Sequence, residues 1–542
     1  MKPLRTGVFI CSCGPNIGDR MDLERLGSGV SGIEGVALVQ QHSLLCSPAG
    51  KSFLEEAIRD GGFDRVVIAA CSPRDHLGTF MDVCRAAGTN PFMMQMVNVR
   101  EQCAWITDDR ELATDKALRM IRGAVARSAL HRPLEVREIE CSPDVVVIGA
   151  GAAGLRTALS LASTGRRIFL LERTDSPGGR HSGMPEVREM AERAACCGDI
   201  EVMTGCEPED IRGFFGNFLV TLQDGTGISA GAVVLATGSR DGVELLAEMG
   251  YGDLPDVRTS AEATHMLDSD SLAMESGSVP RRVAIVDCAG RNGCGYCSVV
   301  CCDDTLELAG RLSRFREDIE VTVYHGQVCT SLGSLRAWRE RLEETGCRLV
   351  DSGVTGMDRT GEGLVPRLDT EGAPAGIFDM VILQAPRVPA AGFDRLASIL
   401  RTGTDPGGFP LPEHDRLSPV TTAIDGVYLA GSSAGPCRIG DALIQADAVA
   451  GTILSVLVPG RKVSTEPCVS VIPPSLCRGC RTCMEICVYG AISWSEEERV
   501  CSVNTVLCRG CGGCAAACPS GAPRASHFTS GQLRRQVVGV LE

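Results

Sequence analysis

Two cysteine runs near the end of the chain have the residue type and spacing that iron–sulfur clusters require. In each run two residues separate the first three cysteines and three precede the fourth, and Pro519 follows the second run. Three thiolates of such a run surround one cubic [4Fe–4S] cluster, and the fourth reaches a neighbouring cluster. The competing interpretation is a pair of zinc knuckles or disulfides, which two full copies at this spacing disfavour. The spacing predicts two crossed ligand sets: Cys477, Cys480, Cys483 and Cys518, and Cys508, Cys511, Cys514 and Cys487.

A glycine-rich segment, Gly149-Ala-Gly-Ala-Ala-Gly154, directly follows a short apolar stretch at residues 145–148. A helix is expected through Ser163, and the next apolar stretch ends before Glu172. In a dinucleotide fingerprint, glycines let the backbone approach a pyrophosphate at a helix N-terminus, and the acidic residue accepts ribose hydroxyls. The predicted cofactor contacts in this region are Gly149, Gly151, Ala152, Ala153, Gly154, Glu172 and Arg173.

Three later motifs favour FAD over NAD as the bound dinucleotide. Gly178-Gly-Arg180 follows the acidic residue, and residues 232–238 (AVVLATG) and 426–431 (GVYLAG) resemble the later motifs of two-dinucleotide-binding flavoproteins. Those flavoproteins usually have Asp after the last glycine, where this chain has Ser432, so Asp441 is the expected substitute for the ribityl contact. The further predicted contacts are Gly179, Arg180, Thr237, Gly238, Gly431, Ser432 and Asp441.

The half of the chain that would bind a pyridine nucleotide should start near the apolar stretch 282–286. No glycine fingerprint follows it, so direct NAD(P)H binding is not expected; five cysteines stand there instead. Cys294 and Cys297 could form a dithiol/disulfide pair, as in thioredoxin reductases. Alternatively, another cluster could be ligated by Cys288, Cys297, Cys301 and Cys302.

Three domains are predicted to position these cysteines and cofactor-binding residues. Buried strands are expected at residues 7–10 and 65–70, a helix within Glu101–Leu130, a polar hinge around 131–143 and a proline-containing linker at 459–475. The fold class is α/β, with a thioredoxin-reductase-like, two-dinucleotide-binding flavoprotein domain between an N-terminal α/β iron–sulfur domain and a C-terminal bacterial-type 2[4Fe–4S] ferredoxin domain. The predicted domains are residues 1–135, 144–458 and 468–542.

Composition limits the partners and the compartment. The 542-residue chain has a formal net charge of -15 and only 4% aromatic residues, which argues against nucleic acid or an anionic membrane as partner. No signal peptide and no uninterrupted apolar run long enough to span a membrane is found, so no membrane insertion is expected. Many of the 28 cysteines have cluster spacings, which predicts a reducing cytoplasm, as in an anaerobe.

These motifs together resemble the A subunit of heterodisulfide reductase, a flavoprotein of methanogens and many anaerobic bacteria. The resemblance covers nearly the whole chain. It rests on the flavin motifs, the terminal cysteine runs, and four further stretches: Val8–Gly14 (VFICSCG), Cys71–Arg74 (CSPR), Asn98–Cys103 (NVREQC) and Tyr296–Cys302 (YCSVVCC).

The resemblance implies FAD and four [4Fe–4S] clusters. It favours the cluster interpretation at Cys288, Cys297, Cys301 and Cys302, beside the flavin. It also implies a cluster in the N-terminal domain without indicating which four cysteines bind it, and buried structural cysteines remain the alternative there. The matching N-terminal cysteines are Cys11, Cys13, Cys46, Cys71 and Cys103.

The chain departs from the family pattern in two places. Larger members carry a second ferredoxin module inserted in the flavin domain, and no such cysteines occur between Gly238 and Val283. The family resemblance implies that members that bifurcate electrons have a lysine near the flavin N5, five residues after the Cys-Cys pair. At the corresponding position this chain has Glu307. Glu307 is thus the candidate catalytic neighbour of N5, where a carboxylate would oppose an anionic reduced flavin.

The resemblance implies an electron-transfer oxidoreductase subunit in which FAD exchanges electron pairs with single-electron clusters. Flavin-based bifurcation is the sharper version, and a plain relay of the quinone-interacting oxidoreductase type is the alternative. A stand-alone disulfide reductase using Cys294 and Cys297, or a scaffold with structural clusters, are the other hypotheses. The implied partners are ferredoxin, the B and C subunits of such a complex, and a hydrogenase- or dehydrogenase-linked subunit. They would form a multisubunit complex, which could itself be dimeric.

Overall fold

The computed structural model describes residues 4–542, apart from the side chain of Asn292. The chain divides into two compact units. One contains residues 4–139 together with 464–542, and the other contains residues 140–463. Both divisions lie within the segments that the sequence suggests as hinge and linker. The two ends of the chain, which the sequence treats as separate domains, therefore share one unit.

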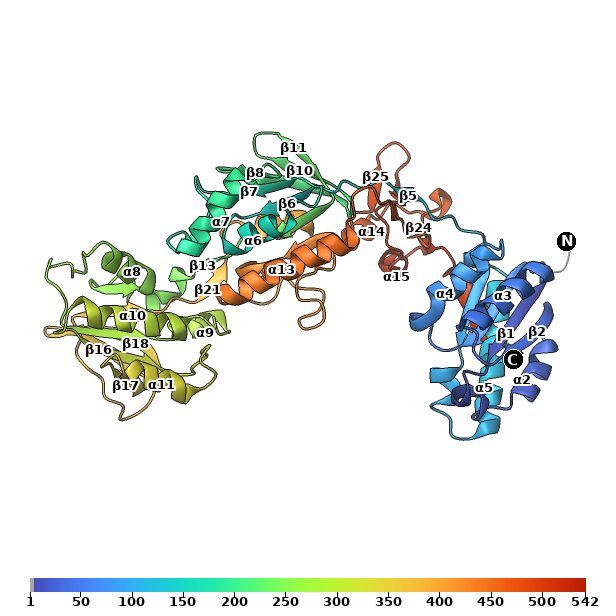
Figure 1. Ribbon diagram of the computed structural model, residues 1–542, viewed down its shortest axis with the longest axis horizontal. Coiled ribbons are helices and arrows are strands. Elements are labelled where there is room, and N and C mark those ends of the chain that lie inside the picture. Colours follow the sequence, from blue (N-terminus) through green and yellow to red (C-terminus); the bar gives the residue numbers. More distant parts are fainter. Residues whose placement is uncertain (1–3) are drawn as a thin grey trace. The chain divides into compact units, whose positions relative to one another are not determined.

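The first unit begins with a parallel four-stranded sheet of order β2-β1-β3-β4 (Figure 1). The two central strands are apolar and fully buried, as their sequences predict, because helices cover both faces. Helices α2 and α5 pack on one face, and α3 and α4 pack on the other. The elements are β1 (Thr6–Cys11), α2 (Leu23–Ser31), β2 (Val36–His42), α3 (Pro48–Gly61), β3 (Arg65–Ala70), α4 (Pro73–Ala86), β4 (Met94–Asn98) and α5 (Arg110–Ser128).

The helix expected from Glu101 begins later than its periodicity predicts. Residues Arg100–Ala104 form a single π turn, and α5 starts at Arg110. The Asp109 carboxylate accepts hydrogen bonds from the backbone N–H groups of Glu111 and Leu112, which is a strong N-cap. This cap fixes the start of the helix where apolar periodicity alone does not.

The C-terminal module of this unit has an internal twofold pattern. Two short antiparallel strand pairs, β24–β27 and β25–β26, accompany two short helices, α14 and α15, which contact each other. A final helix, α16, packs along α5. The elements are β24 (Ser470–Val471), α14 (Thr482–Glu485), β25 (Ile492–Ser495), β26 (Val500–Val503), α15 (Gly513–Ala517), β27 (Arg524–Ala525) and α16 (Ser530–Leu541).

The second unit starts with a parallel sheet of order β22-β12-β6-β7-β8, whose strands match the apolar stretches of the flavin motifs. Helices α6, α7 and α13 cover one face, and an antiparallel sheet of β9, β10 and β11 covers the other with α12. The elements are β6 (Val145–Ile148), α6 (Ala152–Leu161), β7 (Ile168–Leu171), α7 (Pro185–Cys196), β8 (Ile200–Met203), β9 (Pro208–Phe214), β10 (Asn217–Leu222), β11 (Gly227–Ala230), β12 (Ala232–Leu235), α12 (Phe393–Leu400), β22 (Val427–Leu429) and α13 (Ile439–Val456).

A second sheet repeats this plan, with order β14-β20-β15-β16-β17. Helices α8, α10 and α11 cover one face, and the hairpin β18–β19 covers the other. The connection between the two halves is a two-stranded antiparallel sheet of β13 (Ser239–Asp241) and β21 (Arg387–Pro389). The elements are β14 (Val257–Thr259), α8 (Ser260–Asp268), β15 (Arg282–Val286), α10 (Cys301–Phe315), β16 (Glu320–His325), α11 (Leu335–Glu343), β17 (Arg348–Asp351), β18 (Val354–Thr360), β19 (Gly363–Leu368) and β20 (Met380–Leu383).

Among the described residues, α13 is the one helix long and apolar enough to cross a membrane by length and composition. Asp441 and Asp447 interrupt it, so the sequence contains no uninterrupted apolar run here. Ala442, Ala446 and Ile453 on one face of the helix are buried in the core beneath the first sheet of the second unit. The apolar character of α13 thus has a role in packing.

Candidate functional site

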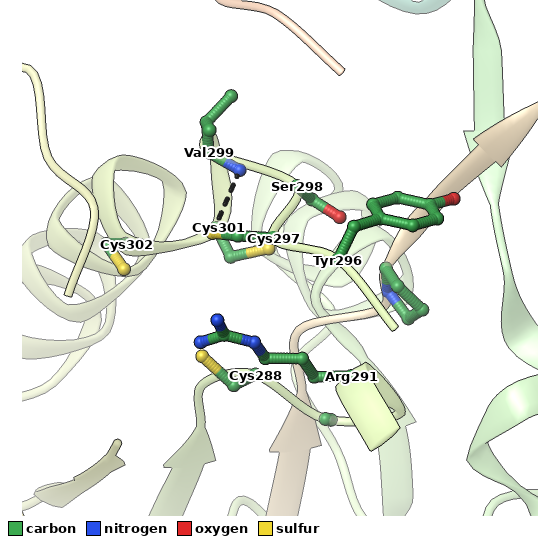
Figure 2. A pocket seen from close by; sticks show the side chains of 10 residues that line it. Cys288, Arg291, Tyr296, Cys297, Ser298, Val299, Cys301 and Cys302 are labelled. Atoms are coloured by element: carbon green, nitrogen blue, oxygen red, sulfur yellow. Dashed lines mark hydrogen bonds between the residues drawn. The ribbon is translucent and has the colours of Figure 1, made fainter. Parts of the chain in front are cut away.

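Four cysteines line one cavity at the end of β15, in the half that lacks a glycine fingerprint. Cys288 directly follows Asp287 at the end of that strand, Cys297 lies in a loop, and Cys301 and Cys302 begin α10. Figure 2 shows the Arg291 guanidinium beside the Cys288 sulfur, and the two side chains interact electrostatically. The four residues that the resemblance implies as one ligand set therefore line the same cavity, although no three His, Cys, Asp or Glu side chains among the described residues are arranged to hold a metal ion.

Backbone donors already point at two of these sulfurs. The N–H of Val299 donates to Cys297 Sγ at 3.4 Å, and the N–H of Cys329 donates to Cys302 Sγ at 3.4 Å. Burial raises the pKa of Cys302 to about 12 and raises that of Cys301 as well. Free thiols at these two positions are therefore protonated at neutral pH, so metal binding there releases protons.

Two further cysteines, Cys294 and Cys329, belong to the same part of the second unit. The Cys294 thiol donates to the carbonyls of Arg291 and Tyr296 at 3.5 and 3.3 Å, and in the part of the chain that the structure describes it is not in the cavity wall. Cys329, which the sequence gives no role, makes a side-chain hydrogen bond with Cys297. This contact joins residues far apart in sequence, so no motif predicts it.

In the C-terminal module, one crossed ligand set lines a single cavity. Cys508, Cys511 and Cys514 of the second run face this cavity together with Cys487 of the first run. The cavity thus contains the fourth cysteine of the opposite run, as the spacing predicts. The N–H of Ala491 donates to Cys487 Sγ at 3.4 Å, the type of contact that stabilises a thiolate.

The other crossed set gathers around the small core of the same module. Cys477, Cys483 and Cys518 pack in that core, and Cys480 is exposed. A fifth sulfur, Cys501, lies among them: it interacts with Cys477, Cys480 and Cys483. Cys501 lies between the two runs and outside their spacing, so the sequence predicts no role for it.

In the N-terminal domain, four of the five candidate cysteines lie near one another and the fifth does not. The charge on Cys11 is coupled to those of Cys13 and Cys46, and that of Cys71 to Cys13. Arg100 Nη1 donates to Cys13 Sγ at 3.7 Å. Cys103 is fully buried on the other side of the sheet, where its thiol contacts Met120 Sδ at 3.5 Å.

The glycine fingerprint forms an open cradle at the N-terminus of α6. A Cβ on Gly151 would have no atom within 4 Å, so this side of the backbone is open, and no side chain caps the helix. A Cβ on Gly149 or Gly154 would instead lie 2.3 or 1.9 Å from a backbone carbonyl oxygen. Nearby, Thr237 Oγ1 is buried without a hydrogen-bond partner among the described atoms. These observations fit a phosphate-bearing group at this place.

A cavity of about 210 Å³ extends from this cradle along the ends of β6 and β7. Glu172 lies in its wall and accepts hydrogen bonds from the N–H groups of Ala150 and Thr174, each at 2.9 Å. Arg173 also lines the cavity, and its Nη1 donates to Ala391 O at 2.9 Å. The cavity where the ribose is predicted to bind is thus open, and hydrogen bonds hold the side chains of Glu172 and Arg173 in its wall.

The late motif packs against the same helix. Gly431 has a φ of +67°, and a Cβ there would lie 2.7 Å from Ala153 Cβ, so glycine permits close approach. The Ser432 hydroxyl contacts Cys437 Sγ at 3.5 Å. Asp441 is exposed in the first turn of α13.

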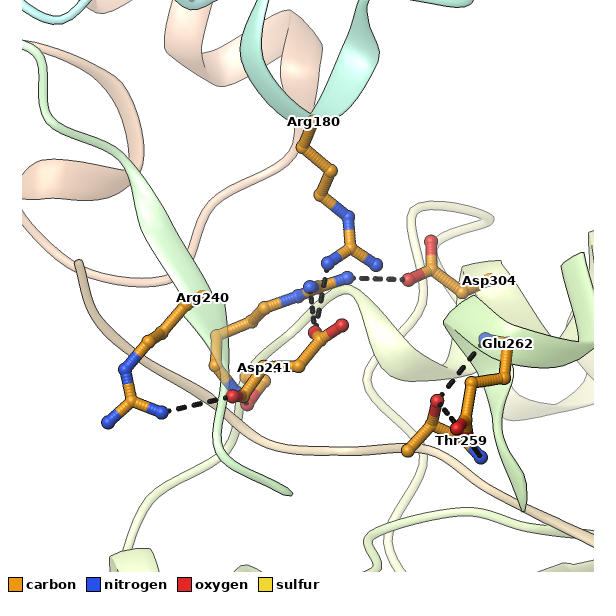
Figure 3. Close-up of polar contacts among 8 residues, drawn as sticks. Arg180, Arg240, Asp241, Thr259, Glu262 and Asp304 are labelled. Carbon is orange, nitrogen blue, oxygen red and sulfur yellow. Dashed lines mark hydrogen bonds and ion pairs between the residues drawn. The ribbon is translucent and has the colours of Figure 1, made fainter. Parts of the chain in front are cut away.

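An ion-pair network with the buried Arg387 at its centre joins the flavin motifs to the cysteine cavity (Figure 3). Asp241 binds both Arg180 Nη1, at 2.9 Å, and Arg387. Arg387 Nη2 lies 3.3 Å from Asp304 Oδ2, one turn into α10. Burial raises the pKa of Asp304 to about 6. Arg387 also anchors the cysteine loop: its N–H donates to Ser298 Oγ and its carbonyl accepts from the Tyr296 hydroxyl.

Glu307 is exposed on α10 and lies outside the wall of the cysteine cavity. It is close enough to Asp304 to raise the pKa of that carboxyl. The neighbouring Asp303 is paired with Arg438 at 2.8 Å, directly before α13. The cations paired with Asp303 and Asp304 are therefore arginines from distant segments, in a region that contains no lysine.

Comparisons with known proteins agree with the two cofactor-binding regions. Residues 86–253 match the pyridine nucleotide-disulphide oxidoreductase family, and residues 476–522 match the 4Fe-4S dicluster domain. Among solved structures, the thioredoxin reductase of T. acidophilum is 19% identical with a TM-score of 0.42, covering 58% of this chain and 99% of that one.

Two curated relatives match over most of their length. The A subunit of the H(2):CoB-CoM heterodisulfide,ferredoxin reductase of Methanothermobacter thermautotrophicus is 30% identical, covering 100% of this chain and 98% of the relative. The A subunit of the Ferredoxin/F(420)H(2)-dependent CoB-CoM heterodisulfide reductase of Methanosarcina acetivorans is 29% identical, covering 90% and 75%. The first alignment spans 654 positions, so that relative carries segments with no counterpart in this 542-residue chain. The chain belongs to the family of heterodisulfide reductase A subunits, which are flavin- and iron–sulfur-containing oxidoreductases.

Proposed function

We propose that this protein is a plain electron relay, which passes electrons between a two-electron flavin site and single-electron clusters. The observation that carries the proposal is the cavity of four cysteines at the end of β15. It occupies the place where the second nucleotide-binding half would have its glycine loop, so a metal centre replaces a nicotinamide there. FAD, when bound, supplies the step from paired to single electrons.

Four ligand sets follow from the grouping of the cysteines. The cysteine cavity supports one [4Fe–4S] cluster, and the crossed sets of the C-terminal module support two. The N-terminal domain would hold a fourth on Cys11, Cys13, Cys46 and Cys71, since these four interact and Cys103 faces a different core. The remaining ligands are Cys288, Cys297, Cys301 and Cys302; Cys477, Cys480, Cys483 and Cys518; and Cys508, Cys511, Cys514 and Cys487.

The residues of the glycine cradle would hold FAD in a fixed orientation. Gly151 leaves room for the pyrophosphate at the positive end of α6, and Glu172 accepts the ribose hydroxyls. The unpaired Thr237 hydroxyl lies beside the same cradle and can donate to the cofactor. Ser432 and Asp441 lie at and after the late motif, where the ribityl chain would run.

A relay without bifurcation is supported by the charges near the cysteine cavity. Glu307 is exposed, and Arg387 and Arg438 are each paired with a carboxylate of α10. An unpaired cation that would stabilise an anionic reduced flavin is therefore not provided by these residues. The missing cluster insert also removes one route by which electrons could leave.

The partners would be the other subunits of a heterodisulfide-reductase-like complex. The names of the relatives mention ferredoxin, hydrogen and the CoB-CoM heterodisulfide. By analogy we propose B- and C-type subunits, a hydrogenase- or dehydrogenase-linked donor, or ferredoxin as neighbours. Cys480 and Cys511 are exposed, so a partner cluster could approach either proposed cluster of the C-terminal module near one of them.

The test compares two single substitutions in protein loaded anaerobically with iron, sulfide and FAD. Cys297→Ser is expected to lower the iron content by about four atoms per chain while flavin stays bound. The control, Cys294→Ser, keeps the iron, because its thiol is turned toward backbone carbonyls. A disulfide reductase would behave differently: both substitutions would abolish thiol–disulfide turnover and neither would change the iron content.

A further inference from the structure

The two cysteine runs of the C-terminal module each have a partner residue seven positions upstream. Ser470 precedes Cys477 by seven residues, and Cys501 precedes Cys508 by seven. Both lie on short strands, β24 and β26, and each side chain is 2% exposed. Serine and cysteine thus occupy equivalent positions in the internal repeat.

Each of these residues contacts the run that it does not precede. The N–H of Ser470 donates to Cys508 Sγ at 3.4 Å, and its hydroxyl lies 3.4 Å from Cys514 Sγ. The N–H of Cys501 donates to Cys477 Sγ at 3.5 Å, and its thiol lies close enough to Cys483 for the two side chains to interact. In both halves the first and third cysteines of a run are therefore bridged by one residue.

The two bridges differ in one atom, the donor of the side-chain hydrogen bond. When the third cysteine is a thiolate ligand, it can only accept, so the hydroxyl or thiol must donate to it. A hydroxyl is the stronger donor, since S–H is a weak one. Hydrogen bonds to cluster sulfurs stabilise the extra electron of the reduced cluster and raise its reduction potential.

We propose that Ser470 and Cys501 are matched positioning residues that separate the reduction potentials of the two C-terminal clusters. The weaker donor, Cys501, lowers the potential of the cluster on Cys477, Cys480, Cys483 and Cys518 relative to that of its neighbour. The difference gives electron flow between the clusters a preferred direction. This inference rests on the proposed ligand sets of the module.

The experiment is an anaerobic redox titration of the loaded full-length protein, followed by electron paramagnetic resonance. Cys501→Ser should shift one cluster to higher potential, and Cys501→Ala should shift the same cluster to lower potential. Ser470→Cys and Ser470→Ala should both lower the potential of the other cluster. Ser502→Ala, on the same strand and paired only with Ser493 among the described residues, is the control and should shift neither.

Opposite signs for Cys501→Ser and Cys501→Ala separate a hydrogen-bond donor from a residue that only fills space. Unchanged potentials in the Cys501 and Ser470 variants, with eight iron atoms still bound by the module, would overturn the inference and leave the ligand sets standing. Loss of iron in Cys501→Ala would also overturn it, because Cys501 would then be a ligand. If iron is lost only when one of the proposed cysteine ligands is substituted, the two ligand sets of the C-terminal module are supported.

Discussion

At the scale of single residues, the three glycines of the fingerprint have separable roles. Gly151 has φ of -74° and open space at its Cβ position, so a side chain fits the fold but fills the cradle. We expect Gly151→Val to fold with a thermal midpoint near that of the unsubstituted apoprotein and to lose most of its FAD. Flavin absorbance per chain and thermal unfolding of the apoprotein measure the two effects.

Gly154→Ala provides the contrasting case, because its Cβ would lie 1.9 Å from the carbonyl oxygen of Gly149. The strand-to-helix turn must then shift, which costs on the order of 1–3 kcal/mol of unfolding free energy with or without cofactor. Equal destabilisation by both substitutions would show that Gly151 does not face a cofactor.

The N-terminal cysteines give a second prediction for individual residues. Cys46→Ser should remove about four iron atoms from the loaded protein, because Cys46 belongs to the group that interacts with Cys11. Cys103→Ala is the matched substitution, and it should keep the iron while lowering stability, since it empties a buried position beside Met120. Iron loss in Cys103→Ala with retention in Cys46→Ser would reverse the assignment.

At the scale of elements, the contact between α5 and α16 depends on two facing glycines. A Cβ on Gly123 would lie 2.8 Å from Gln536 O, and a Cβ on Gly539 would lie 3.0 Å from Gly123 Cα. We expect Gly123→Leu to separate the helices and to speed amide hydrogen exchange throughout α16. Gly531→Ala in the same helix has no atom within 4 Å of its Cβ and should leave exchange unchanged or slower. Unaltered exchange in Gly123→Leu would contradict the packing described.

A stacked histidine pair makes the same region sensitive to acid. The rings of His131 and His527 lie 4.2 Å apart, and burial, with the charges of His527, Arg127 and Arg65, lowers the pKa of His131 from 6.5 to about 4. At a pH between 4 and 6.5, His131 therefore binds a proton in the unfolded chain but not in the folded one. Stability is therefore complete above pH 6.5 and falls as the pH drops toward 4, by on the order of 2 kcal/mol at pH 5.

Hydrogen exchange of α16 at pH 7 and pH 5 measures this linkage, after correction for the intrinsic rate. His131→Phe retains an aromatic ring but cannot bind a proton, so it should lose the part of the pH dependence that His131 contributes, while His527, whose pKa burial also lowers, keeps its own. The same pH dependence in His131→Phe and in the unsubstituted protein would assign it to other groups.

The sequence predicts elements well where the signal is local and poorly where it is tertiary. The buried strands and the glycine fingerprint follow from consecutive residues, as do the crossed cysteine runs. Periodicity places the start of α5 too early, because a π turn precedes the Asp109 cap. The bridge from Arg387 to Asp241 joins residues 146 positions apart, and the position of Cys501 depends on a strand pair. The spacing of residues along the chain cannot predict such contacts, because they form only in the tertiary structure.

At the scale of the whole molecule, the second unit contains two halves of the same topology that differ in their first loop. After β6 the loop is a glycine cradle, and after β15 it is a loop of cysteines. Arg387 connects the β21 strand between the halves to that loop, because its N–H donates to the Ser298 hydroxyl and its carbonyl accepts from the Tyr296 hydroxyl. Under the proposed function, the first of these loops would hold a dinucleotide and the second a cluster.

The measurement that tests the relay most directly is an anaerobic redox titration of the bound flavin, followed optically and by electron paramagnetic resonance. For a plain relay we expect the first one-electron potential to lie above the second, so that the flavin gives up its electrons to the clusters one at a time over a broad range of potential. Strongly crossed potentials, with the second electron far easier to add than the first, would contradict a plain relay and would establish the conditions for bifurcation despite Glu307.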